Sequence, residues 1–422
     1  MTGVIAPPPG LGELLRVSLK IGLLSFGGPA GQIAMMHRVF VDEKRWLEEK
    51  DYLSALSFCM LLPGPEAMQL ATYAGWRLRG IPGGLIAGLL FVLPGAVLML
   101  GLAMAYARFG AVGPVAAAFL GVKAAVVAIV IEALMKVARR ALGRRDHWLL
   151  AGLAFAAIFF LNLPFPALVL AAALYGFFSG GSAVGAAPAP AGRPRTAATA
   201  LGWLAIWWLP LLLLWLLVPG SVLIGIGLFF AKLAVVTFGG AYAVLAYMAQ
   251  QAVTVEGWLS AEQMIDGLGL AETTPGPLIL VTEFVGFLAA YGAGGMWLGI
   301  AGAGVALWMT FAPCFLWIFT GAPYIARPSA QPRLKNALAA VTAAVVGVIL
   351  NLTLWFALHV LFTEVTRLTL GPVILWWPDP ASADPFAIAL AGLAAYLLLW
   401  RHWGMLPVLA LSGMLGLLAM LV

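Results

Sequence analysis

Long apolar runs constrain this chain more than any other feature of its sequence. Three of them, at 82–106, 115–131 and 292–319, approach or exceed the roughly 20 residues that a helix needs to cross the hydrocarbon core of a bilayer. Only 9% of the 422 residues are charged, whereas soluble domains average about 25%. We therefore predict an all-α polytopic membrane protein.

The remaining composition narrows the class further. Residues 1–15 lack the basic residues that precede the apolar core of a cleaved signal peptide. Cys59 and Cys314 lie within apolar segments, so they indicate neither a disulfide framework nor a metal site. The net charge of +6 is what basic cytoplasmic loops contribute. We expect a multi-pass protein of the bacterial cytoplasmic (inner) membrane, in contact with lipid, without a cofactor, a metal or a nucleic-acid partner.

The sequence repeats itself. With an offset of 212 positions, the two halves align without a gap from Lys20 to Pro65. The matched segments include Phe26-Gly27-Gly28 with Phe238-Gly239-Gly240, and Pro63-Gly64-Pro65 with Pro275-Gly276-Pro277. Between the halves, 183–200 has the Ala, Pro and Gly content of a linker. We predict a first transporter repeat at 1–182, a linker at 183–200 and a second repeat at 201–422.

Basic residues orient the two repeats. The first-half loops at 37–50, 76–80 and 139–147 are rich in Lys and Arg, whereas the matching second-half loops hold Arg367 as their only strongly basic residue. Conversely, 108–114 is nearly uncharged, while its counterpart 326–335 is basic. The positive-inside rule then places equivalent loops on opposite sides of the membrane. The repeats are predicted to be inverted, with an extra crossing helix at 201–218.

The two Pro-Gly-Pro segments are predicted to break membrane helices. Segments 52–62 and 66–76, on either side of the first break, are each long enough for about half a bilayer. Arg45 and Arg77 flank them, and both are expected to be cytoplasmic. The segment is therefore predicted to be re-entrant. Irregular backbone is tolerated at this depth where it lines a cavity, and broken helices in inverted repeats indicate a transporter site.

The breaks have the chemistry to bind an anion. Helices that start after Pro65 and Pro277 offer free N–H groups and positive dipole ends, which suits an oxyanion. Glycine lets the backbone approach a ligand closely. The alternative is that Pro and Gly only kink packed helices. Besides two lysines, the predicted substrate-binding residues are Ser25, Phe26, Gly27, Gly28, Gln32, Pro63, Gly64, Pro65, Thr237, Phe238, Gly239, Gly240, Thr273, Thr274, Pro275, Gly276 and Pro277.

The two lysines are Lys20 and Lys232, which occupy equivalent positions in the repeat. Ionisable residues inside a membrane are functional candidates because burying them is costly. We predict that these lysines attract the anion, with snorkelling to the interface as the alternative. Lys123 lies near an expected helix end, where snorkelling is favoured.

Three glutamates are predicted to couple transport to protons: Glu66, Glu272 and Glu283. Glu66 follows a proline that starts a helix, so capping the helix dipole is its alternative role. Glu132 is expected to form a local salt bridge with Lys136, four residues further on.

Several motifs resemble one known family. "SFGGPAGQIAMMHRVFVDEKRWL", "LLPGPEAMQLATYAGW" and "FVLPG" are similar to the first domain of the chromate ion transporter family, and "TFGGAYAVLAYMAQQAV" and "DGLGLAETTPGPLILVTEFVGF" are similar to its second. The resemblance covers nearly all of the chain and matches the long, two-domain members. Its signature positions correspond to Phe26-Gly27-Gly28, Pro63-Gly64-Pro65-Glu66, Phe238-Gly239-Gly240 and 272–277.

The resemblance implies a secondary transporter that exports chromate, coupled to the proton gradient as an antiporter, and confers chromate resistance. A transporter of sulfate or another oxyanion, or an anion channel of the same architecture, is the alternative. An enzyme is not expected, because the sequence shows no nucleotide motif and no ligand set for a redox cofactor. The oligomeric state stays open, a homodimer included. Segments 148–178 and 386–422 are each expected to form a hairpin of two short helices, the second helix beginning near Pro164 and Met405.

Overall fold

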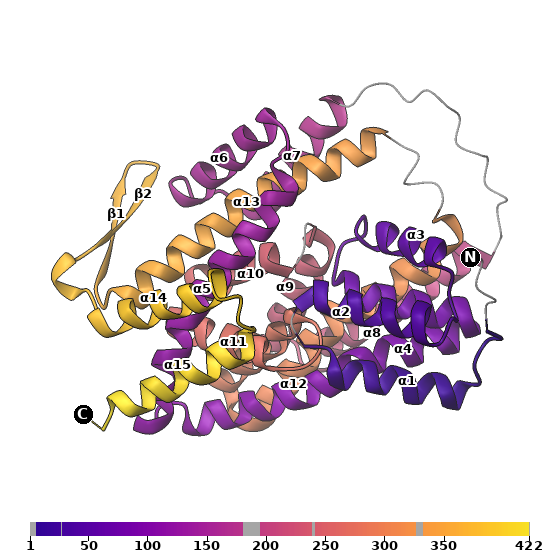
Figure 1. The fold of residues 1–422 in the computed structure, drawn as a ribbon, viewed down its shortest axis with the longest axis horizontal. Helices are drawn as coiled ribbons and strands as arrows, with labels where there is room; N and C mark the ends of the chain where they lie inside the picture. The colour runs from indigo at the N-terminus through magenta and orange to yellow at the C-terminus, as the bar shows by residue number, and fades with distance from the viewer. Residues whose placement is uncertain (1–5, 27, 180–194, 239–240, 326–331, 422) are drawn as a thin grey trace. The chain divides into compact units, whose positions relative to one another are not determined.

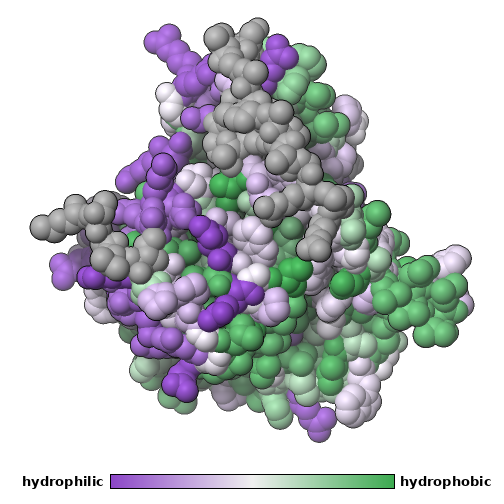
Figure 2. Space-filling model, turned by 90° about the vertical axis from the view of Figure 1, so that its right-hand side faces the viewer, coloured by the Kyte–Doolittle hydropathy of each residue, from purple (hydrophilic) through white to green (hydrophobic). Residues whose placement is uncertain are grey.

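The computed structural model describes residues 6–26, 28–179, 195–238, 241–325 and 332–421, and these are mostly helical (Figure 1). Within these ranges, five helices are long and apolar enough to cross a membrane: Glu66–Phe109, Gly113–Ala141, Thr196–Leu217, Leu278–Tyr324 and Pro332–Leu361. Figure 2 shows hydrophobic residues over much of the face in view, with hydrophilic residues gathered along one side. The prediction of an all-α polytopic membrane protein is confirmed.

The chain folds as two compact units. One contains 1–103, 182–241 and 274–335, and the other contains 104–181, 242–273 and 336–422. Each unit therefore takes segments from both halves of the sequence. The predicted division into two repeats and a linker rests on internal similarity instead, and it stays a prediction. Most of the predicted linker, 183–194, lies outside the described residues.

The first unit holds the segments around all four predicted breaks. Helix α8 corresponds to the predicted extra crossing helix and begins at Arg195, inside the range predicted as linker. Two indoles fasten α8 to α12, because Trp207 Nε1 donates to Met309 O and Trp308 Nε1 donates to Trp207 O, each at 3.1 Å. The elements of this unit are α1 (Leu11–Leu24), α2 (Gly28–His37), the π-helix η1 (Arg38–Glu43), α3 (Glu49–Cys59), most of α4 (Glu66–Phe109), α8 (Arg195–Leu217), α9 (Val222–Val236), η3 (Leu278–Leu280), α12 (Val281–Gly321) and η4 (Ala322–Tyr324).

Helix α4 consists of two legs that fold back on each other. Its 44 residues would span about 66 Å as one straight helix, roughly twice the hydrocarbon core. The helical dihedrals fail at Arg79 and Gly80, where Gly80 has φ +63°. A Cβ on Gly75 would lie 2.1 Å from Gly83 O, so the backbones of the two legs are in direct contact. The first leg agrees with the predicted return segment of a re-entrant break.

Helix α12 is built in the same way. Its dihedrals fail at Gly294 and Gly295, and Gly295 has φ +78°. A Cβ on Gly302 would lie 2.3 Å from Gly286 O. In both helices, glycine therefore provides the left-handed residue at the reversal and the small surface that lets the legs approach.

The second unit is built around α5. Gly121 of α5 approaches α15 so closely that a Cβ would lie 1.8 Å from Ser412 O, and Gly416 of α15 approaches Ala117 O in return. Small residues thus allow tight helix contact without bulky side chains. The elements are α5 (Gly113–Ala141), α6 (Arg145–Phe159), α7 (Phe165–Ser179), α10 (Ala241–Ala249), the π-helix η2 (Gln250–Val255), α11 (Ala261–Thr273), α13 (Pro332–Leu361), β1 (Val365–Leu370), β2 (Val373–Pro378), η6 (Pro380–Ser382), α14 (Pro385–Leu399) and α15 (Met405–Ala419).

The short-helix predictions for this unit are confirmed, and one element was missed. Helices α6, α7, α14 and α15 have 15 residues each, and α7 and α15 begin at Phe165 and Met405. The segment after α13 was expected only as a loop, but it forms the antiparallel hairpin β1–β2. Its β-branched residues favour extended backbone, and Gly371 with φ +62° supports the two-residue turn.

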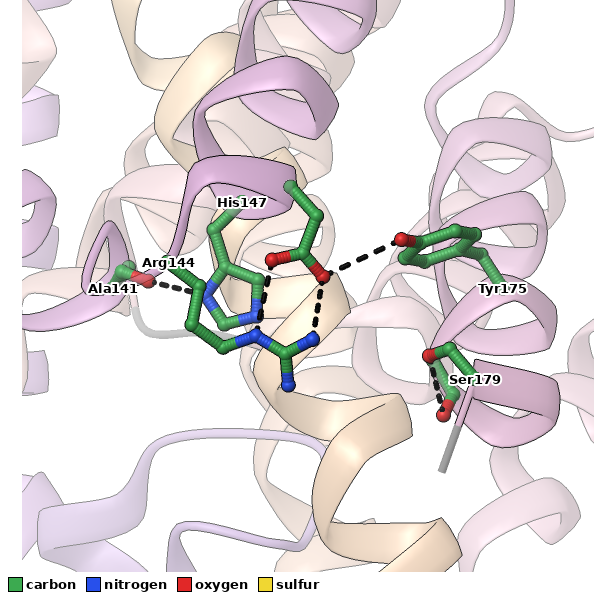
Figure 3. Close-up of polar contacts among 7 residues, drawn as sticks. Ala141, Arg144, His147, Tyr175 and Ser179 are labelled. Atoms are coloured by element: carbon green, nitrogen blue, oxygen red, sulfur yellow. Dashed lines mark hydrogen bonds and ion pairs between the residues drawn. The ribbon is translucent and has the colours of Figure 1, made fainter. Parts of the chain in front are cut away.

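The basic loop between α5 and α6 is held by a local polar cluster (Figure 3). Arg144 donates to both oxygens of Asp146 at 3.0 and 2.9 Å, and Tyr175 of α7 donates to the same carboxylate at 3.3 Å. Desolvation opposes the charged form, but the Arg144 guanidinium outweighs it and lowers the pKa of Asp146 below its ordinary value. His147 Nδ1 lies 2.8 Å from Ala141 O at the end of α5.

Local geometry recurs at the spacing of the internal similarity. The π-helices η1 and η2 begin 212 positions apart, at Arg38 and Gln250. After them, Trp46 N donates to Phe40 O and Trp258 N donates to Ala252 O, each at 2.8 Å. These equal geometries support a duplicated unit. The inverted orientation of the copies stays a prediction.

Candidate functional site

Hydroxyl side chains close the ends of α1 and α9. Ser25 Oγ donates to Ile21 O at 2.6 Å, and Thr237 Oγ1 donates to Leu233 O in the equivalent place. Both hydroxyl residues are buried. Ser25 and Thr237 are the C-cap residues of α1 and α9, so their backbone carbonyl oxygens lie beyond the last helical turn and can accept bonds from elsewhere.

The Phe-Gly-Gly segments follow these two residues. Phe26 and Phe238 are half-buried. Gly28 opens α2 with φ +74°, a conformation that favours glycine. The other predicted glycines, Gly27, Gly239 and Gly240, lie outside the described residues.

Each Pro-Gly-Pro segment turns the chain at a left-handed glycine. Gly64 has φ +110° and Gly276 has φ +96°. After Pro65 the chain enters α4 at Glu66, whereas after Pro277 it first makes the 3₁₀ turn η3. The predicted breaks in helical structure at both places are confirmed. The second helix starts with a tighter turn than the first.

The two breaks are bonded reciprocally within the first unit. Gly64 N donates to Thr237 O at 3.0 Å, and Gly276 N donates to Ser25 O at 2.8 Å. These two bonds are equivalent at the offset of 212. In each, the backbone N–H of the glycine in one half donates to the backbone carbonyl oxygen of Ser25 or Thr237 in the other half. Segments that are far apart in the sequence are thereby brought together at one place.

Gln32 reinforces only one of the two crossings. Its side chain is fully buried, and its Nε2 donates to Gly276 O at 2.6 Å and to Ser25 O at 3.3 Å. The equivalent second-half position is Val244, which cannot make these bonds. Gln32 Oε1 has no hydrogen-bond partner among the described residues. The site is therefore asymmetric in its polar groups.

Gln69 is a site residue that the sequence interpretation missed. It is fully buried in the first turn of α4, and its Nε2 donates to Pro63 O at 2.6 Å. This bond ties the start of α4 back to the break before it. An amide one turn into a membrane helix, directly after a Pro-Gly-Pro break, was a signal that could have found it.

We call the place where the bonds of Gly64 and Gly276 join the two halves the crossing. A small cavity lies there. Its volume is about 20 Å³, enough for roughly one water molecule. The first turn of α4 borders it, so the free N–H groups of a helix N-terminus are at its wall. The lining residues are Pro29, Gln32, Gly64, Pro65, Glu66, Ala67, Thr237, Pro277, Leu278 and Ile279.

The two predicted lysines do not line this cavity. Lys20 lies on an exposed face of α1, and Lys232 lies on an exposed face of α9. Their role in attracting an anion stays a prediction.

Two of the three predicted glutamates belong to the first unit. Glu66 opens α4 and borders the cavity. Glu283 is buried in the first turn of α12 with 3% exposure, and its Oε2 has no hydrogen-bond partner among the described residues. Burying an unpaired carboxylate in its charged form is costly. The proton-coupling role of Glu283 stays a prediction.

Glu272 belongs to the second unit, although it precedes Pro275 by only three residues. Tyr242 OH donates to Glu272 Oε1 at 2.8 Å, and Glu132 and Lys136 are near enough to act on its charge. The predicted Glu132–Lys136 salt bridge is confirmed at 2.6 Å. Two further predicted residues, Thr273 and Thr274, lie at the end of α11 and just after it, half-buried and buried respectively.

A second acidic residue of α11 was also missed. Asp266 is buried, accepts a hydrogen bond from Tyr106 OH at 2.8 Å and lies 4.0 Å from Lys123 Nζ. Lys123 also lies 3.9 Å from Glu262. The Lys123 ammonium group therefore faces two carboxylates of α11, and the expectation that it snorkels stays a prediction.

Known proteins are similar to this chain along nearly its whole length. A family model described as "Chromate transporter" matches residues 12–177 and 224–417. A chromate transport protein from Cupriavidus metallidurans is 32% identical over 93% of this chain and 95% of its own length. One from Pseudomonas aeruginosa is 33% identical over 98% and 94%, respectively. An uncharacterized transporter from Methanocaldococcus jannaschii is 26% identical over 94% and 92%. No solved structure matches the chain.

These matches agree with the predicted family in both halves, and the family model leaves out 178–223 around the predicted linker. The matched ranges contain all the predicted site residues, since 12–177 covers the first pair of breaks and 224–417 covers the second. Together with the membrane-spanning helices, they identify a multi-pass protein of the cytoplasmic membrane. The chain belongs to the chromate transporter family.

Proposed function

We propose that this protein exports chromate across the cytoplasmic membrane and binds it at the paired breaks of the first unit. The observation that carries the proposal is the reciprocal bonding of Gly64 to Thr237 and of Gly276 to Ser25. It holds two broken helices around a cavity that borders the N-terminus of α4. Such a helix end supplies unpaired N–H donors and a positive dipole, which suit a tetrahedral oxyanion. The names of the relatives support chromate as that anion.

Binding requires the crossing to open. A cavity of about 20 Å³ holds roughly one water, which is less than an oxyanion needs. We propose that the breaks separate to admit the anion from the cytoplasmic side, and that the site then opens to the other side and releases it. Such a movement must break the backbone hydrogen bonds donated by Gly64 and Gly276, because these bonds join the two halves at the crossing.

Glu66 is our first candidate for proton coupling. Its charged carboxylate and a bound anion would compete for the same backbone N–H groups and positive dipole end at the start of α4. Two negative charges so close together are disfavoured. Anion binding therefore favours a protonated Glu66, and release of the anion favours its deprotonation. Because the anion and the proton are then bound together, Glu66 would couple their movement in the same direction. Exchange of an outgoing anion for an entering proton would instead need a carboxylate that loses its proton when the anion binds. Export by either route would confer chromate resistance.

Glu272 is the second candidate. Tyr242 holds its carboxylate through a 2.8 Å hydrogen bond, and the Glu132–Lys136 pair acts on its charge. This cluster belongs to the second unit, whereas Glu66 belongs to the first. Separate substitutions therefore test two distinct coupling sites.

Voltage alone also favours export. Moving a dianion out of a negative cytoplasm gains about 2.3 kcal/mol per charge per 100 mV. A uniporter or an anion channel would thus expel chromate without protons. Coupling must be measured separately from transport.

Chromate uptake into inverted membrane vesicles tests the proposal. Wild type is compared with Glu66→Gln, Glu272→Gln and a Pro63→Ala/Pro65→Ala double variant, each driven by a pH gradient or by voltage alone. Glu43→Gln is the matched control, because Glu43 is exposed and pairs with Arg38 at the end of η1.

We expect saturable uptake that the proline variant abolishes. Loss of only the pH-driven component in Glu66→Gln or Glu272→Gln would identify the coupling residue. Uptake that does not saturate would favour a channel. Uptake of sulfate without uptake of chromate in wild type would overturn the substrate and keep the site.

A further inference from the structure

A larger cavity lies in the second unit, apart from the breaks. Its volume is about 110 Å³, several times the roughly 10–15 Å³ that one water requires. Residues of α10, of η2, of α13, of the end of α6 and of the β1–β2 hairpin surround it. The lining residues are Ile158, Phe159, Asn162, Ala246, Ala249, Gln250, Thr254, Asn351, Leu352, Trp355, Arg367, Ile374 and Trp376.

The β1–β2 hairpin presents one face to this cavity. In its register Arg367 pairs with Trp376 and Thr369 with Ile374. Because side chains alternate between the two faces of a hairpin, Arg367, Ile374 and Trp376 point to the same side, and all three line the cavity. Ile374 N donates to Phe160 O at 2.7 Å, which anchors the hairpin to the end of α6. Figure 1 shows the hairpin projecting from the helices beside α14.

Arg367 is the only charged residue in the lining. Its guanidinium lies 5.8 Å from the ring centre of Trp376, a cation–π contact that fixes its position. None of the ion pairs among the described residues involves Arg367. Two acidic residues of the same loop are used elsewhere, since Asp379 caps η6 and Asp384 caps α14. No carboxylate lines the cavity beside Arg367, whose side chain is exposed and lies three residues after the exposed Glu364.

Neutral hydrogen-bonding groups complete the lining. Asn162, Gln250, Thr254 and Asn351 all border the cavity. Gln250 Nε2 donates to Asn162 Oδ1, so the acceptor of Asn162 is occupied and its NH₂ group remains a donor. Thr254 Oγ1 donates to Gln250 O within η2, so its hydroxyl proton is already used. A guanidinium with amide donors, and without a carboxylate, is a set that suits an oxyanion and not a cation.

We propose that this cavity is a second binding site for a tetrahedral oxyanion, with Arg367 as its principal ligand. The site goes beyond the proposed function, because it is separate from the breaks and does not depend on transport. Sulfate, chromate and the phosphate of an anionic lipid headgroup share the required chemistry. Asn351 and the paired amides Asn162 and Gln250 would supply the neutral hydrogen bonds.

The test is binding of radiolabelled sulfate to the full-length protein in nanodiscs of phosphatidylcholine. Measurements use a Gln32→Leu background to weaken the site at the breaks. Arg367→Gln removes the charge, Arg367→Lys keeps it, and Asn351→Leu removes an amide. Arg401→Gln is the matched control, because Arg401 is exposed and does not line the cavity. Size-exclusion elution checks that every variant is folded.

We expect Arg367→Gln to weaken sulfate binding at least about tenfold, as loss of a charged hydrogen bond does. Arg367→Lys should keep part of the sulfate affinity, and Arg401→Gln should leave the sulfate affinity unchanged. Repeating the titration in phosphatidylglycerol nanodiscs identifies the source of the anion. Weaker sulfate binding there, dependent on Arg367, indicates a lipid headgroup, and unchanged binding indicates a free anion. Equal affinity in wild type and Arg367→Gln, in both lipids, would overturn the proposal.

Discussion

At the scale of single residues, the crossing depends on two glycines with a conformation that other residues rarely adopt. Gly64 and Gly276 have φ values of +110° and +96°. Only glycine reaches this region without a steric cost. Each also donates its backbone N–H across the site, so its conformation and its bond are linked.

We predict that Gly64→Ala and Gly276→Ala each lower the free energy of unfolding by about 1–2 kcal/mol, because a Cβ is strained at positive φ. Chromate transport should fall with them. At Gly64 the new Cβ would also lie 3.0 Å from Gln69 Nε2. Gly101→Ala is the control, since nothing lies within 4 Å of its Cβ position. Thermal unfolding of the purified variants measures the effect, and equal stability of all three would contradict it.

Gln32 gives a second prediction at this scale. Gln32→Leu removes the donor to Gly276 O and Ser25 O. Leaving buried acceptors with fewer partners costs about 1–3 kcal/mol. We expect a lower unfolding temperature and a higher KM for chromate. The surface variant Gln251→Leu, which loses only an exposed bond to Glu256, should leave both values unchanged. If Gln32→Leu had the same KM as wild type, Gln32 would have no part in binding chromate.

At the scale of elements, α4 and α12 behave as helical pairs joined by a sharp reversal. Their inner faces carry glycines because the backbones of the two legs are in contact. Close packing of small residues is the main source of helix association in lipid, where the hydrophobic effect between helices is absent. The reversals therefore depend on contacts that a longer side chain would prevent.

Two glycines of α12 test this dependence within one helix. Gly302 has Gly286 O 2.3 Å from its Cβ position, whereas Gly304 has nothing within 4 Å. We predict that Gly302→Ala destabilises the protein by about 1–3 kcal/mol, as overpacking does. Gly304→Ala should be neutral or stabilising by up to about 1 kcal/mol, because alanine is the better helix former. The yield of monodisperse protein and the unfolding temperature report both effects. The opposite order of the two variants would exclude the folded-back arrangement of α12.

At the scale of the whole molecule, the central prediction is that the two copies are inverted. The basic loop between α5 and α6 is expected on the cytoplasmic side, and the β1–β2 hairpin, with Arg367 as its one strongly basic residue, on the opposite side.

Accessibility of single cysteines checks this orientation. Cys59 and Cys314 are buried and would first be replaced by alanine and serine. Gly143→Cys then places a thiol in the loop between α5 and α6, and Thr366→Cys places one on the hairpin. A membrane-impermeant thiol reagent added to intact cells should label position 366 and leave 143 unlabelled. Inverted vesicles should give the reverse pattern. Labelling of both positions from one side would rule out the inverted orientation.

Much of this molecule follows from local sequence patterns. The apolar runs predict the membrane helices, and Pro-Gly-Pro segments predict the breaks, because proline removes an N–H and glycine permits positive φ. The short helices beginning at Phe165 and Met405 agree with the positions expected from the sequence. Each of these features depends on residues within a few positions of one another.

Other features depend on contacts between distant segments. The partners of Gly64 and Gly276 lie in opposite halves of the sequence, and the pairing of Lys123 with Asp266 joins α5 to α11. Gln69 and Arg367 were not recognised as site residues, because their importance comes from the backbone oxygen or the cavity that they meet. The sequence alone therefore determined the membrane class, the helices and the places where they break. Tertiary structure decided which breaks meet and which polar groups face a cavity, because both depend on close packing between segments that the sequence does not connect.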